Sequence, residues 1–470
     1  MTFVDRIFGR LDHTRFAIMA LGIGALIGAL AVMDPRLPIL LLALAVGGYV
    51  ALSRPEILVP LLFLGIMMEA SGKTGLAIAG LPLTLSKIAV LGMVSVWAIR
   101  SAVERRPFLK PLPFTGGMVV VAMSMVIGVG IVGSAGPGQI QTVLSFVMVC
   151  VMAHLIERMI PINRLSWLVR VMGITTIGIM LTQFSKSPVE SALDDRYSGA
   201  FLDANNWAMI LLLIAPLILA VYAEEKNRLW AIPMALFVVL LGANILQSLS
   251  RSGLITSLLV LPVILTISWR RSWIFLVALG LLPFVIGAFV SMDAMYDRYI
   301  TLVDQTYGEA DGSMLQRAEL ARTAWLLFRE NMVFGVGQGH FIDSAMARTN
   351  GNAHLIAHNT YLNIAAELGL VGLAAHAFLF FVVVRQGVQA VFRAKTRRLQ
   401  RLVLGYAAGM LSFALMSATL NNIAFPMGYF VLGLGAVICR ATYMSKEELE
   451  AVDLGDPTTD KPGSLLAQAA

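Results

Sequence analysis

Three basic residues stand at the edges of long apolar runs in this chain: Arg196, Arg251 and His358. An arginine presents a planar fork of N–H donors that binds phosphate oxygens in pairs, and a neutral histidine accepts a proton near pH 7. If the three side chains converge, they can hold a diphosphate and deprotonate a hydroxyl beside it. An anionic lipid headgroup with a diphosphate leaving group fits that set.

Each of these residues also has a simpler explanation. A lone arginine at a helix end, such as Arg251, more often extends its guanidinium to the membrane surface. Arg196 can be a solvated loop residue, and His340 and His354 are near enough in the sequence to compete with His358. Arg251 fits the simple explanation least well, because an arginine on the outer side opposes the usual excess of basic residues inside.

The sequence does not indicate metal chemistry, and we expect neither a metal nor another cofactor. Asp194 and Asp195 are adjacent acids on the expected outer side, but neighbouring side chains diverge on a helix or a strand. Cys150 and Cys439 lie inside apolar runs, so a disulfide framework and a thiolate metal site are not supported. The glycine-rich stretch 335–340 follows an expected helix rather than a strand, and we interpret it as a turn.

The composition is that of an integral membrane protein. Hydrophobic residues make up 58% of the 470 and charged residues 13%, with a mean hydropathy of +0.80, far from the balance of a soluble domain. Apolar runs of near membrane-crossing length recur along the chain. There are fourteen, or twelve full spans if the second and third form a re-entrant pair about Ser53-Arg54-Pro55: 16–33, 38–52, 56–69, 85–100, 113–133, 139–156, 164–183, 206–222, 229–248, 253–269, 272–291, 360–384, 401–420 and 424–440.

Basic residues predict the orientation of the spans. With both termini in the cytoplasm, 23 of the 35 Lys and Arg residues fall on the inner side and 11 on the outer side, as the positive-inside rule requires. The segments 184–205 and 292–359 are then long outer loops, and loops of that length inside a bundle are usually functional. We therefore expect a multi-pass membrane protein with both termini in the cytoplasm and its functional loops on the outer side.

The second long loop contains an expected amphipathic helix. Ser313 and Gln316 have the spacing of a capping box, and apolar residues then recur at helical spacing: Met314, Ala318, Ala321, Trp325 and Phe328. The predicted fold is thus an all-α transmembrane bundle with one large extracytoplasmic loop. We divide it into an N-terminal bundle (1–183), a core (184–384, including loop 292–359), a C-terminal pair of spans (385–444) and a cytoplasmic tail (445–470).

Four short motifs in this order resemble the O-antigen ligase and polysaccharide polymerase superfamily, which are membrane glycosyltransferases of the GT-C type. The resemblance covers roughly residues 196–372, and Ala204 departs from the proline of many members. Gly369 and Gly372 close the last motif, and we expect them to let a neighbouring helix approach closely. The motifs are Arg196-Tyr197-Ser198-Gly199-Ala200-Phe201 with Asp203 and Asn205; Ser250-Arg251-Ser252-Gly253; Arg317 and Trp325 followed by Phe334-Gly335-Val336-Gly337; and His358-Asn359 followed after nine residues by Gly369-Leu370-Val371-Gly372.

The resemblance implies transfer of a glycan from an undecaprenyl-diphosphate donor to a hydroxyl acceptor, without nucleotide sugar. It also implies that the protein lies in the bacterial inner membrane and that its active site faces the periplasm. Since no carboxylate nucleophile is evident, direct attack with inversion would follow. By position, Arg196 and Arg251 would bind the diphosphate, and His358 would orient or deprotonate the acceptor. The remaining candidates for substrate binding are Arg317 as a third phosphate contact, Asn359, which would orient the histidine, Asn205 and Tyr197.

The sequence leaves several functions open. A polymerase, whose acceptor is another lipid-linked repeat, is favoured slightly by the number of spans and the compact tail. A ligase would instead use lipid A–core, and partners could include other proteins of polysaccharide assembly and export. A transporter or flippase of lipid-linked glycan would place charges inside spans and pair broken helices in two halves of the chain, neither of which is evident. A structural subunit of an envelope complex would need none of the three basic residues.

Overall fold

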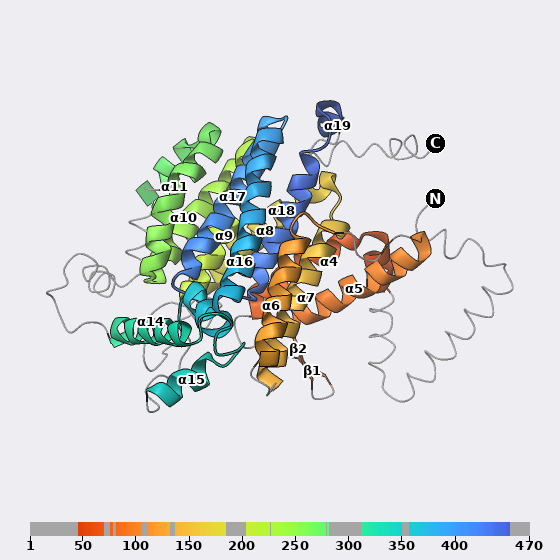
Figure 1. Ribbon diagram of the computed structural model, residues 1–470. Coiled ribbons are helices and arrows are strands. Elements are labelled where there is room, and N and C mark those ends of the chain that lie inside the picture. The colour runs from red at the N-terminus through yellow and green to blue at the C-terminus, as the bar shows by residue number, and fades with distance from the viewer. Residues whose placement is uncertain are drawn as a thin grey trace, which may run out of the picture.

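A computed structural model gives the fold of residues 46–69, 76–78, 81–105, 107, 111–131, 137–184, 204–225, 227–278, 280–281, 312–349 and 357–451. These residues form a bundle of long helices with one small sheet (Figure 1). The helices are α4 (Leu58–Glu69), α5 (Leu85–Glu104), α6 (Thr115–Ile131), α7 (Pro137–Met159), α8 (Leu165–Phe184), α9 (Ala204–Glu224), α10 (Ala231–Gln247), α11 (Arg251–Ile267), α14 (Gly312–Glu330), α15 (Phe341–Arg348), α16 (Thr360–Arg393), α17 (Arg397–Ser417), α18 (Pro426–Ala441) and α19 (Lys446–Ala451).

The predicted all-α membrane bundle is confirmed. Among the described residues, seven helices are long and apolar enough to cross a membrane, or eight if one bent pair counts as a span. That pair, Val46–Ser53 and Pro55–Met68, turns by 109° at the predicted pivot. The helices α6, α11 and α18 are shorter and apolar and match three further predicted runs. The run 16–33 and much of 272–291 lie outside the described residues, so the total of 12–14 spans stays a prediction.

Helix α9 forms the centre of the bundle. Every residue from Ala204 to Ala223 is buried except Asn206, because α8, α10, α11 and α17 all pack against this helix. Small residues bring α17 closest: a Cβ at Gly409 would lie 2.2 Å from the carbonyl oxygen of Leu213. Close backbone approach of this kind is a common basis of helix association in membranes.

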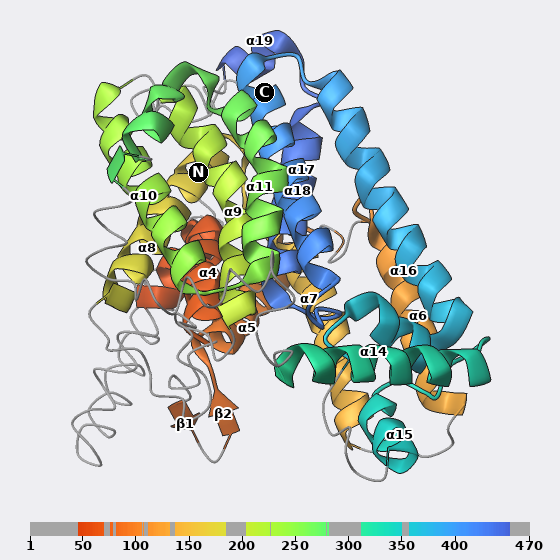
Figure 2. The same ribbon diagram turned by 90° about the vertical axis from the view of Figure 1, so that its left-hand side faces the viewer.

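The two ends of the bundle differ in character. The site end, as we call it, carries α14, α15 and the N-termini of α9, α11 and α16 (Figure 2). At the opposite end, arginines pair with two glutamates that end α9. Arg401 contacts Glu224, and Arg170 and Arg398 lie 3.5 and 3.9 Å from Glu225. Several of the arginines that predicted a cytoplasmic side therefore also hold helix ends together.

Helix α14 lies across the site end, at a steep angle to the long helices (Figures 1 and 2). The predicted helix is confirmed, but its packed face overlaps the predicted one only in part, at Phe328. Leu320, Ala324 and Leu327 are buried against α15 and α16, whereas Trp325 is 50% exposed. The sequence pattern missed this register because α14 packs on two protein elements that come later in the chain.

A two-stranded antiparallel sheet precedes α5 and was not predicted. Its strands are β1 (Leu76–Ile78) and β2 (Leu81–Leu83), with Leu76 opposite Leu83 and Ile78 opposite Leu81. Three residues per strand are too few to show the alternating pattern by which a strand is recognised.

Candidate active site

The start of α11 is fixed to the start of α9 by a single serine. Ser250 is the N-cap of α11, and its hydroxyl accepts from the N–H of Gly253 at 3.1 Å and donates to the side-chain oxygen of Asn205 at 2.7 Å. The missing side chain of Gly253 permits this contact, since a Cβ there would lie 2.9 Å from that of Ala208. Arg251, the first residue of α11, is thereby held beside the N-terminus of the buried central helix.

The backbone just before Arg251 is strained. Leu249 is buried and has φ of +51°, a left-handed conformation that a residue with a bulky side chain rarely adopts. It makes the sharp turn between α10 and α11, so that Ser250 can cap the next helix. Arg251 is half-buried there. Its charge at a helix N-terminus gives the region the properties of an anion site.

His358 and Asn359 form the other side of the candidate site. His358, half-buried, has φ of +46°, and Asn359 follows as the N-cap of α16, its side-chain oxygen accepting from the N–H of Leu362 at 3.0 Å. The sequence suggested that Asn359 orients the histidine. In the structure its oxygen holds the first turn of α16.

The loop between α17 and α18 connects the starts of α9 and α16. The hydroxyl of Thr360 donates to the carbonyl of Leu420 at 2.7 Å and accepts from the N–H of Asn422 at 2.9 Å. The amide of Asn422 in turn contacts the sulfur of Met209, on α9, at 2.9 Å. Arg251 and His358 therefore stand at the same end of the bundle, on helix starts that are joined through α9 and this loop.

Helix α16 is broken at Gly369, and the segment after α14 fills the break. Gly369 has φ of +63° and ψ of −154°. The N–H groups of Leu370 and Val371 donate to the carbonyls of Met332 and Val333, while the carbonyls of Ala366 and Glu367 accept from Val336 and Gly337. Four backbone groups at the break are thus paired, which lowers the cost of breaking a helix in a membrane.

The two glycine motifs fit together at this break. A Cβ on Gly369 would lie 2.4 Å from the carbonyl oxygen of Val333, and one on Gly335 would lie 2.3 Å from the carbonyl carbon of Glu367. The expectation that Gly369 and Gly372 receive a neighbouring helix is wrong. The partner of Gly369 is the turn that follows α14, and a Cβ on Gly372 would meet the side chain of Leu368 in its own helix.

A buried carboxylate anchors the segment before α15, and sequence reasoning missed it. Glu367 is 5% exposed. Its two oxygens accept from the side-chain amide of Gln338 at 2.8 Å and from the backbone N–H of Phe341 at 3.3 Å. A glutamate inside an apolar run is itself the signal that could have found it.

The remaining predicted residues are placed less closely. Arg317 is half-buried on α14, which packs on the first part of α16. Arg196 and Tyr197 lie outside the described residues, and so do Asp194, Asp195 and His354. Within the part of the chain that the structure describes, no three His, Cys, Asp or Glu side chains gather as a metal site would require.

Comparison with known families adds to this geometry. Residues 236–377 match the family described as O-antigen ligase. This match supports the predicted resemblance to the O-antigen ligase and polysaccharide polymerase superfamily. The matched region runs from α10 to the broken helix α16, so it includes Arg251, Arg317, His358 and Asn359 and begins after Asn205. No curated protein compared with the chain matches it. The match and the apolar helices together favour a membrane glycosyltransferase of the ligase or polymerase type.

Proposed function

We propose that this protein transfers a glycan from an undecaprenyl-diphosphate donor to a hydroxyl acceptor on the periplasmic face of the inner membrane. The observation that carries the proposal is that two helices inside the matched region begin at the same end of the bundle and are connected there. Helix α11 begins with Arg251, and α16 begins just after His358. An anion-binding group and a proton acceptor at the same end of the bundle are what displacement of a diphosphate requires.

In the proposed reaction the acceptor oxygen attacks the anomeric carbon of the donor sugar. The new carbon–oxygen bond forms as the bond from that carbon to the diphosphate breaks, and the electron pair leaves with the diphosphate. Arg251, with Arg196 and Arg317, stabilises the negative charge that develops there. His358 accepts the acceptor proton. A single displacement inverts the anomeric carbon and, with arginines supplying the positive charge, needs no metal ion.

Asn205 and Ser250 have a supporting role in this scheme. Their hydrogen bond fixes the first turn of α11, and a rigid helix start holds the guanidinium of Arg251 where charge develops. Preorganisation of this kind is worth more in a water-poor site than a flexible charge would be.

Substitution of the two central residues tests the catalytic proposal. We expect Arg251→Ala and His358→Ala each to lower the transfer rate at least about a hundredfold, the usual effect of removing one charge-stabilising donor. The measurement is the chain-length ladder of surface glycan, together with the rate in proteoliposomes. Arg329→Ala, which removes an exposed arginine from α14, is the matched control. Wild-type ladders from well-expressed Arg251→Ala protein would exclude catalysis by this site.

We infer that the transfer is a polymerisation, with ligation to lipid A–core as the second candidate because the matched family is described as O-antigen ligase. Deletion of the gene distinguishes them. Loss of a polymerase leaves single repeats on the lipid carrier or on the core, whereas loss of a ligase leaves long chains on undecaprenyl diphosphate. A transporter would instead leave the lipid-linked glycan on the inner face of the membrane.

A further inference from the structure

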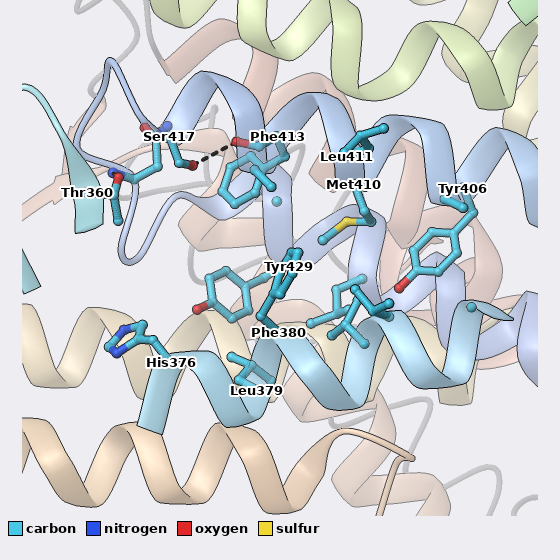
Figure 3. Close-up of a pocket in the computed structure, with 18 of the residues that line it drawn as sticks. Thr360, His376, Leu379, Phe380, Tyr406, Met410, Leu411, Phe413, Ser417 and Tyr429 are labelled. Atoms are coloured by element: carbon cyan, nitrogen blue, oxygen red, sulfur yellow. Dashed lines mark hydrogen bonds between the residues drawn. The ribbon is translucent and has the colours of Figure 1, made fainter. Parts of the chain in front are cut away.

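An apolar cavity runs between α16, α17 and α18, and the linked residues Thr360 and Asn422 described above line one end of it. Its volume is about 380 Å³. Figure 3 shows Thr360 and Ser417 at one end of the cavity and Tyr406 towards the other. The α16 wall includes Phe380 and Val384, which are 54% and 45% exposed although they face other helices.

The cavity exists because α16 leans away from α17. Beyond its break, α16 packs mainly on α6. Two glycines of α6 allow this: a Cβ on Gly117 would lie 2.9 Å from the Cα of Leu379, and one on Gly128 would lie 2.5 Å from the side chain of Leu368. The face of α16 that points towards α17 is consequently left with space in front of it.

The cavity has one polar end and a long apolar remainder, which suits an amphiphilic molecule. Thr360, Ser417 and Asn422 line it at the site end, where α17 ends and α16 begins. The side-chain oxygen of Asn422 is buried and has no hydrogen-bond partner among the described residues. Away from that end the lining is apolar apart from His376 and two tyrosines. The polar end lies beside His358, whose helix begins with Thr360.

The length of the cavity distinguishes a phospholipid acyl chain from a longer polyisoprenoid chain as its occupant. Lining residues extend along the straight part of α16 from His376 to Val391, which is about 22 Å at 1.5 Å per residue. That exceeds half of the ~30 Å hydrocarbon core, and half is all that an acyl chain of one phospholipid leaflet reaches. A polyisoprenoid chain is long enough to follow the whole cavity.

We propose that this cavity holds the polyisoprenyl chain of the lipid-linked donor, with the diphosphate at its polar end. The inference rests on the proposed function, since it places the tail of the same donor. Burial of the chain along the cavity fixes the diphosphate laterally, so that it meets Arg251 and the acceptor in one orientation. Because the chain moves from lipid into an equally apolar cavity, the hydrophobic effect adds little to its binding, and close packing against the cavity wall must supply the affinity. Shape fit, rather than hydrophobicity, is therefore the source of selectivity.

Gly387 offers a direct way to fill the cavity. It is buried and lines the cavity, yet a Cβ there would have nothing within 4 Å. Gly387→Phe therefore adds a ring to empty space. Gly178 of α8 also has nothing within 4 Å of its Cβ position but lies outside the cavity, so Gly178→Phe is the matched control. Val384→Trp, on the same wall, is a second variant should Gly387→Phe fold poorly.

The experiment measures binding of undecaprenyl diphosphate and farnesyl diphosphate to the full chain in nanodiscs. These probes share a headgroup and differ in chain length. Each variant is compared with wild type for the same probe, so partition into the bilayer cancels. We expect Gly387→Phe to weaken undecaprenyl diphosphate at least tenfold and to leave farnesyl diphosphate within about twofold, while Gly178→Phe changes neither.

Other outcomes overturn the inference in distinguishable ways. Equal weakening of both probes would mean that the substitution disturbs the headgroup site, and no weakening of either would mean that the cavity is not used. Displacement of undecaprenyl diphosphate by phosphatidylglycerol would make the cavity a structural phospholipid site. If wild type binds neither probe, the proposed donor itself is wrong.

Discussion

Backbone strain marks the candidate site residue by residue. Among the described residues, three that are not glycine have positive φ: Arg105, Leu249 and His358. Arg105 is the C-cap of α5, where a left-handed residue is ordinary. The other two stand at or two residues before a candidate catalytic side chain. Such conformations cost of order 1–3 kcal/mol each and persist where the surrounding structure enforces them. This agrees with a site in which the side chains must be held in one orientation.

Asn359 provides a test of what a motif residue does. Because its oxygen caps α16, Asn359→Ser should keep the cap and most of the transfer activity. Asn359→Ala should lose the cap, at about 0.5–2 kcal/mol, and most of the activity with it. The measurement is thermal unfolding and transfer rate for both variants. If the serine variant is as inactive as the alanine variant, the amide N–H group of Asn359 is needed for transfer, as expected if Asn359 orients His358.

At the scale of elements, the turn after α14 fits into the break of α16, and we call this fit the interlock. It shows what a sequence pattern can and cannot predict. The glycines at 335, 337 and 369 were visible in the sequence, and a turn after α14 was predicted. Their mutual fit was not predictable, because 335 and 369 belong to separate motifs and meet only through main-chain hydrogen bonds. Glu367 was likewise visible, but its acceptance of the Phe341 N–H depends on that fit.

Gly369→Ala should break the interlock. The new Cβ would lie 2.4 Å from the main-chain oxygen of Val333, on a backbone with positive φ. Relief of this clash requires the main chain of α16 or of the turn after α14 to move. We expect a loss of stability of about 1–3 kcal/mol and an inactive protein, measured by thermal unfolding and transfer rate. Gly387→Ala is the control on the same helix, since its Cβ meets nothing within 4 Å. Equal stability of the two variants would contradict the interlock.

Glu367 should tolerate an amide but not an apolar side chain. In Glu367→Gln one oxygen still accepts from Phe341, and the amide of Gln338 can turn to accept from the new N–H, because its own oxygen has no partner among the described residues. We expect activity within about twofold of wild type. Glu367→Leu leaves two buried donors unpaired, at about 1–3 kcal/mol each. Similar thermal stability of both variants would show that the carboxylate does not anchor this segment.

At the scale of the whole molecule, composition and apolar runs were sufficient to predict the membrane bundle, and charge was sufficient to predict an orientation. The centre of the bundle was not predictable. Helix α9 is no more apolar to inspection than its neighbours, but it alone among the described spans is buried over 94% of its hydrophobic window. Contacts such as Ser250 with Asn205 join residues 45 positions apart, and only the packing of α11 on α9 creates them.

The orientation of the bundle gives the last prediction. The proposed site faces outward only if the end with α14 and α15 is periplasmic and the arginine-paired end is cytoplasmic. Ala347→Cys on α15 and Glu447→Cys on α19 place exposed thiols at those two ends, while Cys439 is buried and Cys150 half-buried within helices. In spheroplasts, a membrane-impermeant maleimide should label Ala347→Cys directly and Glu447→Cys only after permeabilisation, with the parent protein as the unlabelled control. The reverse pattern would put the site in the cytoplasm. A lipid-linked donor that has already crossed the membrane could not reach it there, so the proposed reaction would lose its basis.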